Sequence, residues 1–151
     1  MIEIGIPNLS TPAAIIDRII IEKLKVEEFR QKEQTDLIDT TLCAIHLLNK
    51  QLDKIFKQFP IKGDLTLIGE FFTKYNNLVI MLTIAVGQVS YFENQKALEH
   101  KKNEKKDTAY IAHMDQVSRQ YNEQRSLYKK QLDLLFEECL NIRSTQETRT
   151  F

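Results

Sequence analysis

Apolar side chains recur every seven residues over two long stretches of this chain, and this spacing constrains the fold more than any other feature. In one stretch, Ile38, Ile45, Leu52 and Phe59 form one seam and Leu42, Asn49 and Phe56 a second. In the other, the two seams are Met114, Tyr121, Tyr128, Leu135 and Ile142, and Ile111, Ser118, Arg125, Leu132 and Cys139. Only a helix gathers such positions onto one side, so the spacing predicts an all-α fold.

Turn and capping residues divide the chain into four predicted helices. Thr11 is a good N-cap and Pro12 suits the first helical position, while Pro60 ends a helix near the middle of the chain. The predicted helices are 12–31, 36–59, 65–102 and 107–143, with a frayed tail over 144–151. Their short connections favour a single domain over 1–151, built as an antiparallel four-helix bundle. A three-helix bundle with a projecting hairpin and a dimeric coiled coil remain alternatives.

The charge balance bears on possible partners. Lys and Arg number 21, as do Asp and Glu, so the formal net charge is zero. Nucleic-acid-binding domains usually carry a basic excess, and we therefore expect no nucleic-acid partner. The most apolar stretch, from Leu78 to Val89, is too short to span a bilayer, so we expect no membrane insertion. Cys43 and Cys139 are predicted to be buried, reduced thiols, which indicates a cytoplasmic protein.

Known catalytic and metal-binding motifs are missing. A di-iron bundle needs Glu-x-x-His on two helices, but Cys43, Ala97 and Tyr110 stand three residues before the three histidines. No Gly-rich phosphate loop is present. We therefore predict no metal, no cofactor and no catalytic residues, and the pattern favours a protein that is not an enzyme.

Two charged residues lie on apolar stripes. Asp17 shares a stripe with Ile20, Ile21 and Leu24, and Arg125 lies in a seam beside Asn122 and Lys129. A charge in such a place must be paired or reach an edge, so we predict that Asp17 and Arg125 face one another. One interpretation is a structural ion pair. The other is a site for a small anion or sugar, with Asp17, Asn122, Arg125 and Lys129 as the binding residues. Glu93 is a weaker third candidate.

Short motifs resemble those of an uncharacterised bacterial family of helical proteins. Ile16-Asp17-Arg18-Ile19 with Leu24-Lys25 is similar to the family's opening, and Glu93-Asn94 is similar to its Glu-Asp pair. Tyr121-Asn122-x-x-Arg125-x-x-x-Lys129 is similar to its last helix. The chain lacks the tryptophan that precedes the Glu-Asp pair. The resemblance implies a helical cytoplasmic domain, and some members are associated with glycosyltransferase or surface-polysaccharide proteins.

Two functions fit these features. The first is a non-catalytic module that binds a protein partner or forms a homo-oligomer, because two helices carry heptads and catalytic motifs are missing. The second is a small-ligand binder or enzyme that acts on an anionic sugar or nucleotide sugar through the polar residues between helices. We favour the first.

Overall fold

The computed structural model describes residues 11–57, 65–102 and 108–140. These ranges hold four helices: α1 (Pro12–Gln31), α2 (Thr35–Lys57), α3 (Leu65–Lys101) and α4 (Thr108–Leu140). Helices this long confirm the all-α prediction, and every predicted start lies within one residue of the observed one. The predicted ends of the second and fourth helices, at 59 and 143, and the tail 144–151 lie outside the described residues.

Local sequence sets both ends of α1. The Thr11 hydroxyl oxygen accepts a hydrogen bond from the Ala14 amide at 3.0 Å, and Pro12 occupies the first turn, as predicted. At the other end Glu33 adopts a left-handed conformation with φ 55°, and the Gln34 amide donates to the Phe29 carbonyl at 2.9 Å. This tight turn reverses the chain direction and places α2 antiparallel to α1.

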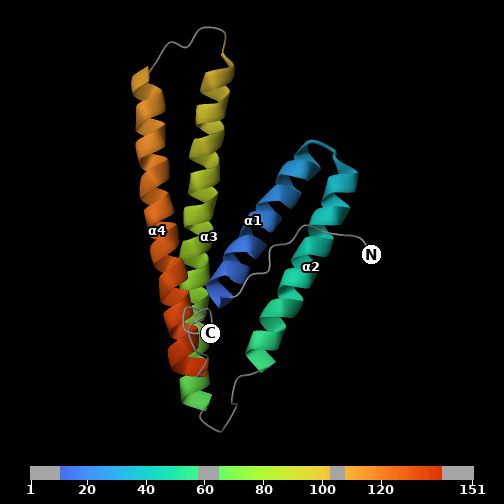
Figure 1. Ribbon diagram of the computed structural model, residues 1–151, viewed down its shortest axis with the longest axis vertical. Coiled ribbons are helices and arrows are strands. Elements are labelled where there is room, and N and C mark those ends of the chain that lie inside the picture. Colours follow the sequence, from blue (N-terminus) through green and yellow to red (C-terminus); the bar gives the residue numbers. More distant parts are fainter. Residues whose placement is uncertain (1–10, 58–64, 103–107, 141–151) are drawn as a thin grey trace, which may run out of the picture.

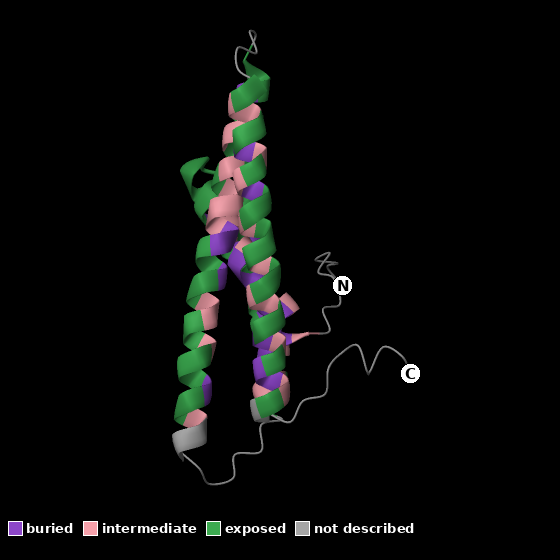
Figure 2. Ribbon diagram, turned by 90° about the vertical axis from the view of Figure 1, so that its left-hand side faces the viewer, coloured by how far each residue is buried: buried purple, intermediate pink, exposed green. Residues whose placement is uncertain are grey.

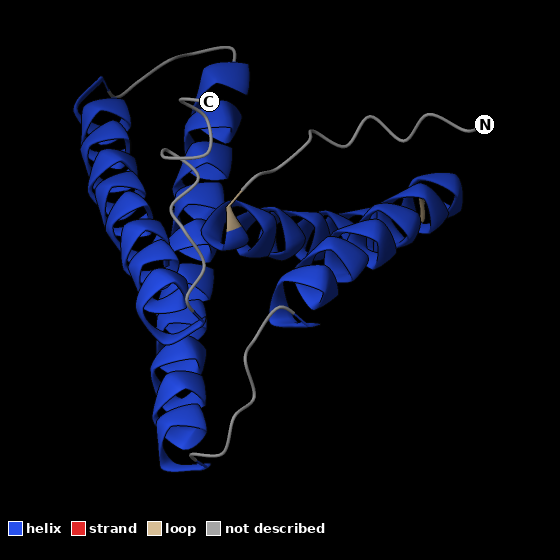
Figure 3. Ribbon diagram, turned by 60° about the horizontal axis from the view of Figure 1, so that its bottom comes forward, coloured by secondary structure: helices blue, strands red, loops and turns tan. Residues whose placement is uncertain are grey.

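The helices form two antiparallel hairpins that diverge like a V (Figure 1). α3 and α4 pack on each other more extensively than any other pair of helices (Figure 1), whereas α1 and α2 form a second hairpin that leans away from them (Figure 3). α1 packs on both α3 and α4, while α2 packs chiefly on α1. The prediction of an antiparallel four-helix bundle is confirmed, with the second hairpin splayed outward from the first.

The core lies where the two hairpins meet (Figure 2). Phe71 and Phe136 are fully buried with ring centroids 5.4 Å apart, and Phe56 reaches Phe136 from α2 at 5.5 Å. Edge-to-face aromatic contacts of this kind stabilise a core beyond the area that they bury. The aliphatic part of the core contains one or more residues from every helix: Ile15, Leu48, Leu82 and Leu132.

The predicted seams are confirmed for α4 but not for α2. In α4, Met114, Ser118 and Leu132 are buried as expected. In α2, Leu42 is 44% exposed and Asn49 is also exposed, so their prediction as seam residues is wrong. α2 packs mainly on one helix and therefore buries one narrow stripe: Thr41, Ala44, Leu48 and Leu52. Leu52 was predicted as a seam residue, whereas the other three lie one residue before a predicted seam position.

Cys43 also differs from the prediction. Its thiol is exposed, because Cys43 lies beside the buried stripe of α2 and not on it. The side chain of Cys139 lies outside the described part of the chain.

Candidate functional site

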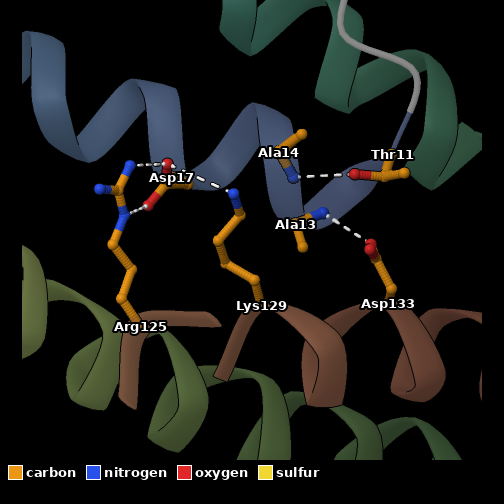
Figure 4. Close-up of polar contacts among 7 residues, drawn as sticks. All are labelled: Thr11, Ala13, Ala14, Asp17, Arg125, Lys129 and Asp133. Atoms are coloured by element: carbon orange, nitrogen blue, oxygen red, sulfur yellow. Dashed lines mark hydrogen bonds and ion pairs between the residues drawn. The ribbon is translucent and has the colours of Figure 1, made fainter. Parts of the chain in front are cut away.

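The predicted contact between Asp17 and Arg125 is present at the junction of α1 and α4 (Figure 4). Arg125 Nε donates to Asp17 Oδ1 at 2.8 Å, and Nη2 donates to Oδ2 at 2.6 Å. Asp17 is only 5% exposed, whereas the Arg125 side chain keeps 26% of its surface exposed. A bidentate, charge-assisted pair in this setting fixes the position of α1 along α4.

Lys129 is the third predicted site residue at this junction. Its Nζ lies 3.8 Å from Asp17 Oδ2, on the opposite side of the carboxylate from Arg125. Asp17, Arg125 and Lys129 together carry one net positive charge. Asn122, the fourth predicted residue, is exposed and shares no hydrogen bond with these three within the described chain.

Asp133 is a member of the junction that sequence reasoning missed. Its Oδ1 accepts a hydrogen bond from the Ala13 amide at 2.9 Å, so a side chain of α4 caps the first turn of α1. Burial raises the pKa of Asp133, and the bond from Ala13 opposes that shift. Asp133 follows Lys129 by four residues and Arg125 by eight, and this spacing on one helix face is the signal that could have identified it. We call Asp17, Arg125, Lys129 and Asp133 the junction cluster.

Arg125 is only partly satisfied by its carboxylate partner. Asp17 raises the pKa of Arg125 and occupies its Nε and Nη2 edge. Nη1 points away from Asp17, and no acceptor among the described residues bonds to it. Arg125 lines a groove of about 760 Å³ between α1 and α3. The junction cluster is therefore open to solvent on one side.

A second polar cluster lies farther along the α3–α4 hairpin. Ser118 Oγ donates to Glu93 at 2.6 Å, and Lys96 contacts both Glu93 and Asp115 at 2.9 Å. Arg119 adds a contact to Asp115 at 2.8 Å. We call Glu93, Lys96, Asp115, Ser118 and Arg119 the distal cluster. The Ser118 hydroxyl and Lys96 lower the pKa of Glu93, so this candidate residue is held as a carboxylate within its own hairpin.

The junction cluster presents charged donors and acceptors beside the groove. Within the described ranges, no group of three or more His, Cys, Asp or Glu side chains is placed to hold a metal ion. None of the described helices is both long and apolar enough to cross a membrane. Charged donors fixed beside a groove favour the binding of an anion.

Comparisons with protein-family models, curated proteins and solved structures give no match to this chain.

Proposed function

We propose that this chain is a non-catalytic helical module that associates with a second copy of itself through the outer face of α3. The outer face is defined by residues that lie on one side of the helix, away from the core: Ile80, Ile84, Gly87, Tyr91 and Leu98. The four large side chains are exposed to 56%, 53%, 55% and 56% respectively. Four large apolar side chains in one row on the surface are typical of an interaction site.

The sequence around this face strengthens the proposal. From Tyr75 to Phe92, α3 contains no charged residue. A helix on the surface of a monomer normally carries charged side chains on its solvent side, whereas a helix that is uncharged all round is typically covered on both sides. α4 and α1 cover the inner side of α3. The uncharged outer side is the single observation on which the proposal rests.

A second copy fits this face in charge and in area. The chain has 21 basic and 21 acidic residues, so two copies approach without net repulsion. The four large side chains of the outer face and the neighbouring Met81, each about half exposed, together offer about 500 Å² per copy, or about 1,000 Å² in a pair. This area meets the lower limit for a specific interface.

The spacing of the face also suits a symmetric, antiparallel pair. A twofold axis near Val89 places Ile80 of one copy beside Leu98 of the other. The same axis places Tyr91 over Gly87, and a Cβ built on Gly87 meets nothing within 4 Å inside its own chain. Gly87 therefore leaves room on the outer face for the ring of a partner copy.

Sedimentation velocity at several protein concentrations tests the proposal. We expect a concentration-dependent dimer, and we expect Ile84→Glu to weaken it at least a hundredfold because a charge is buried without a partner. Leu47→Glu, at an exposed leucine of α2, is the matched control and leaves the dimer unchanged. A monomer at all accessible concentrations, or equal effects of both variants, would refute the proposal.

Gly87→Leu provides a second variant that leaves the core untouched. Because the added side chain extends into open space, the free energy of unfolding of the monomer should not fall. The dissociation constant of the dimer should rise at least tenfold, since the leucine occupies the space of Tyr91. An unchanged dissociation constant would show that the outer face is not the contact.

The proposal also includes a cytoplasmic location and a protein partner in preference to nucleic acid. The exposed thiol of Cys43 suits a reducing compartment, and the balanced charge offers no general attraction to phosphates. The resemblance to the bacterial helical family points to the same compartment. Fractionation of cells that express the chain from its own gene tests the location.

A further inference from the structure

The groove beside Arg125 shares Leu98 with the outer face of α3, but its other lining residues lie outside that face and give it a different chemical character. It lies where the C-terminal halves of α1 and α3 diverge, and its volume is about 760 Å³, within the range of sites that hold small ligands. Aliphatic side chains form part of its walls: Ile21 and Leu24 on α1, and Val86, Val89, Ala97 and Leu98 on α3. One charged residue of α4, Arg125, also reaches it.

Arg125 is held ready for a second anion. A guanidinium has five N–H donors in a rigid plane, and Asp17 takes two of them from one edge. The remaining edge, with Nη1, points away from Asp17 (Figure 4), and Arg125 is one of the residues that line the groove. Because Asp17 already fixes the plane of the guanidinium, a carboxylate or phosphate in the groove would bind it with little loss of side-chain entropy.

The surrounding charge favours an anion as well. Four basic and two acidic side chains line the groove. The two acidic ones already have partners, since Glu27 bonds to Arg30 at 3.0 Å and Glu28 to Lys32 at 2.8 Å. Lys129 offsets the charge of Asp17 behind Arg125. An anion on Arg125 therefore meets a net positive environment.

We infer that this groove binds a small amphiphilic anion. Its carboxylate or phosphate group bonds to the free edge of Arg125, with Ser90 and Asn94 of the groove wall as further polar contacts. Its apolar body lies along the aliphatic walls, where a purely polar anion would leave apolar surface in contact with water. The junction pair thus serves as a preorganised anion receptor as well as a link between α1 and α4.

Isothermal titration calorimetry with decyl phosphate, below its micelle concentration, tests this inference. Inorganic phosphate supplies the head group alone and decyl maltoside supplies the chain without the charge. We expect decyl phosphate to bind at least tenfold more tightly than either. Decanoate in its place distinguishes a carboxylate receptor from a phosphate receptor, and binding of either anion supports the inference. Equal affinity for the charged and the neutral amphiphile would overturn it.

Two variants and one matched control locate the site. Ala97→Glu adds a negative charge to the groove wall at an exposed position outside the outer face of α3, and we expect at least tenfold weaker binding. Ala112→Glu makes the same change at an exposed position of α4 away from the groove and leaves affinity unchanged. Arg125→Lys keeps the charge beside Asp17 but removes the planar fork, so it weakens binding in a chain whose fold is verified by circular dichroism. Unchanged affinity in Ala97→Glu contradicts the inference even where Arg125→Lys does not fold.

Discussion

The junction cluster and the distal cluster both connect α4 to another helix through charged side chains, but their settings differ. Arg125 of the junction bonds to Asp17, which lies 108 residues away in the sequence and is almost fully buried. In the distal cluster, Arg119 is largely exposed, and its partner Asp115 belongs to the same helix. The same residue type thus acts as a long-range structural contact in one place and as a solvated surface group in the other.

What surrounds each cluster explains the difference. α3 and α4 share the most extensive contact of any helix pair. Near the distal cluster, Phe92 stacks on Tyr121 and Met114 is buried, so the cluster adds charges to an interface that apolar contacts already hold. α1 meets α4 only over a short stretch, and its first turn and Asp17 supply the polar contacts there. We therefore expect the junction cluster to control how the two hairpins associate and the distal cluster to contribute little to the free energy of unfolding.

We expect the largest difference between the two clusters when Arg125→Met is compared with Arg119→Met. Loss of Arg125 leaves a buried carboxylate with only Lys129 nearby, and we expect a fall of about 2–4 kcal/mol in the free energy of unfolding. Arg119 is 77% exposed, so its replacement should change this free energy by less than about 0.5 kcal/mol. Urea denaturation monitored by circular dichroism measures the free energy of unfolding of both variants. Similar values for the two variants would remove the distinction between the clusters.

The double variant Asp17→Leu with Arg125→Met sharpens the interpretation. Replacing both charges by apolar side chains removes the unpaired group, so we expect the double variant to recover at least half of the loss caused by Arg125→Met alone. The same urea denaturation gives the coupling free energy. A loss in the double variant equal to the sum of the two single losses would mean that Asp17 and Arg125 act independently, contrary to the geometry.

The sequence predicted this pair because charged residues on apolar stripes are rare and require a partner. Asp17 and Arg125 both had this signature, and Lys129 followed from its place one turn after Arg125. Asp133 had no such signature, because its partner is the backbone amide of Ala13 and every residue except proline has one. Asn122 was proposed from its place beside Arg125 and from the family resemblance, and the structure leaves it exposed and apart from the pair.

The fold, like the junction cluster, could be predicted from the sequence only in part. Apolar spacing identified the inward side of α4, which is long and contributes Leu132, Leu135 and Phe136 to the core. It misplaced the buried stripe of α2, where Leu42 and Asn49 continue the heptad but face solvent. Periodicity reports which side of a helix is apolar and carries no information on the angle between hairpins. The groove depends on that angle and could not be predicted.

A smaller effect is expected from Ser118→Ala in the distal cluster. The Ser118 hydroxyl is buried and donates to Glu93 at 2.6 Å, but Lys96 remains as a partner of this carboxylate. We expect a loss of about 1 kcal/mol in the free energy of unfolding and a rise in the pKa of Glu93. Thermal unfolding and a carboxyl NMR titration measure the two effects. A loss as large as that of Arg125→Met would show that the distal cluster is also structurally essential.

The smallest expected effect is the order in which Asp133 and Asp115 titrate. Burial raises the pKa of Asp133 in the junction cluster, whereas the bond from Lys96 lowers the pKa of Asp115 in the distal cluster. As the pH falls, Asp133 gains its proton first, and this uptake favours the folded chain. Asp115 contributes stability above its unfolded pKa, and this contribution is lost as the pH falls through its folded pKa.

Carboxyl NMR should therefore place the titration midpoint of Asp133 at a higher pH than that of Asp115. The variants Asp115→Asn and Asp133→Asn assign the two signals. Coincident midpoints would mean that the two clusters offer carboxylates the same surroundings, and the contrast between a buried junction and a solvated distal cluster would no longer hold.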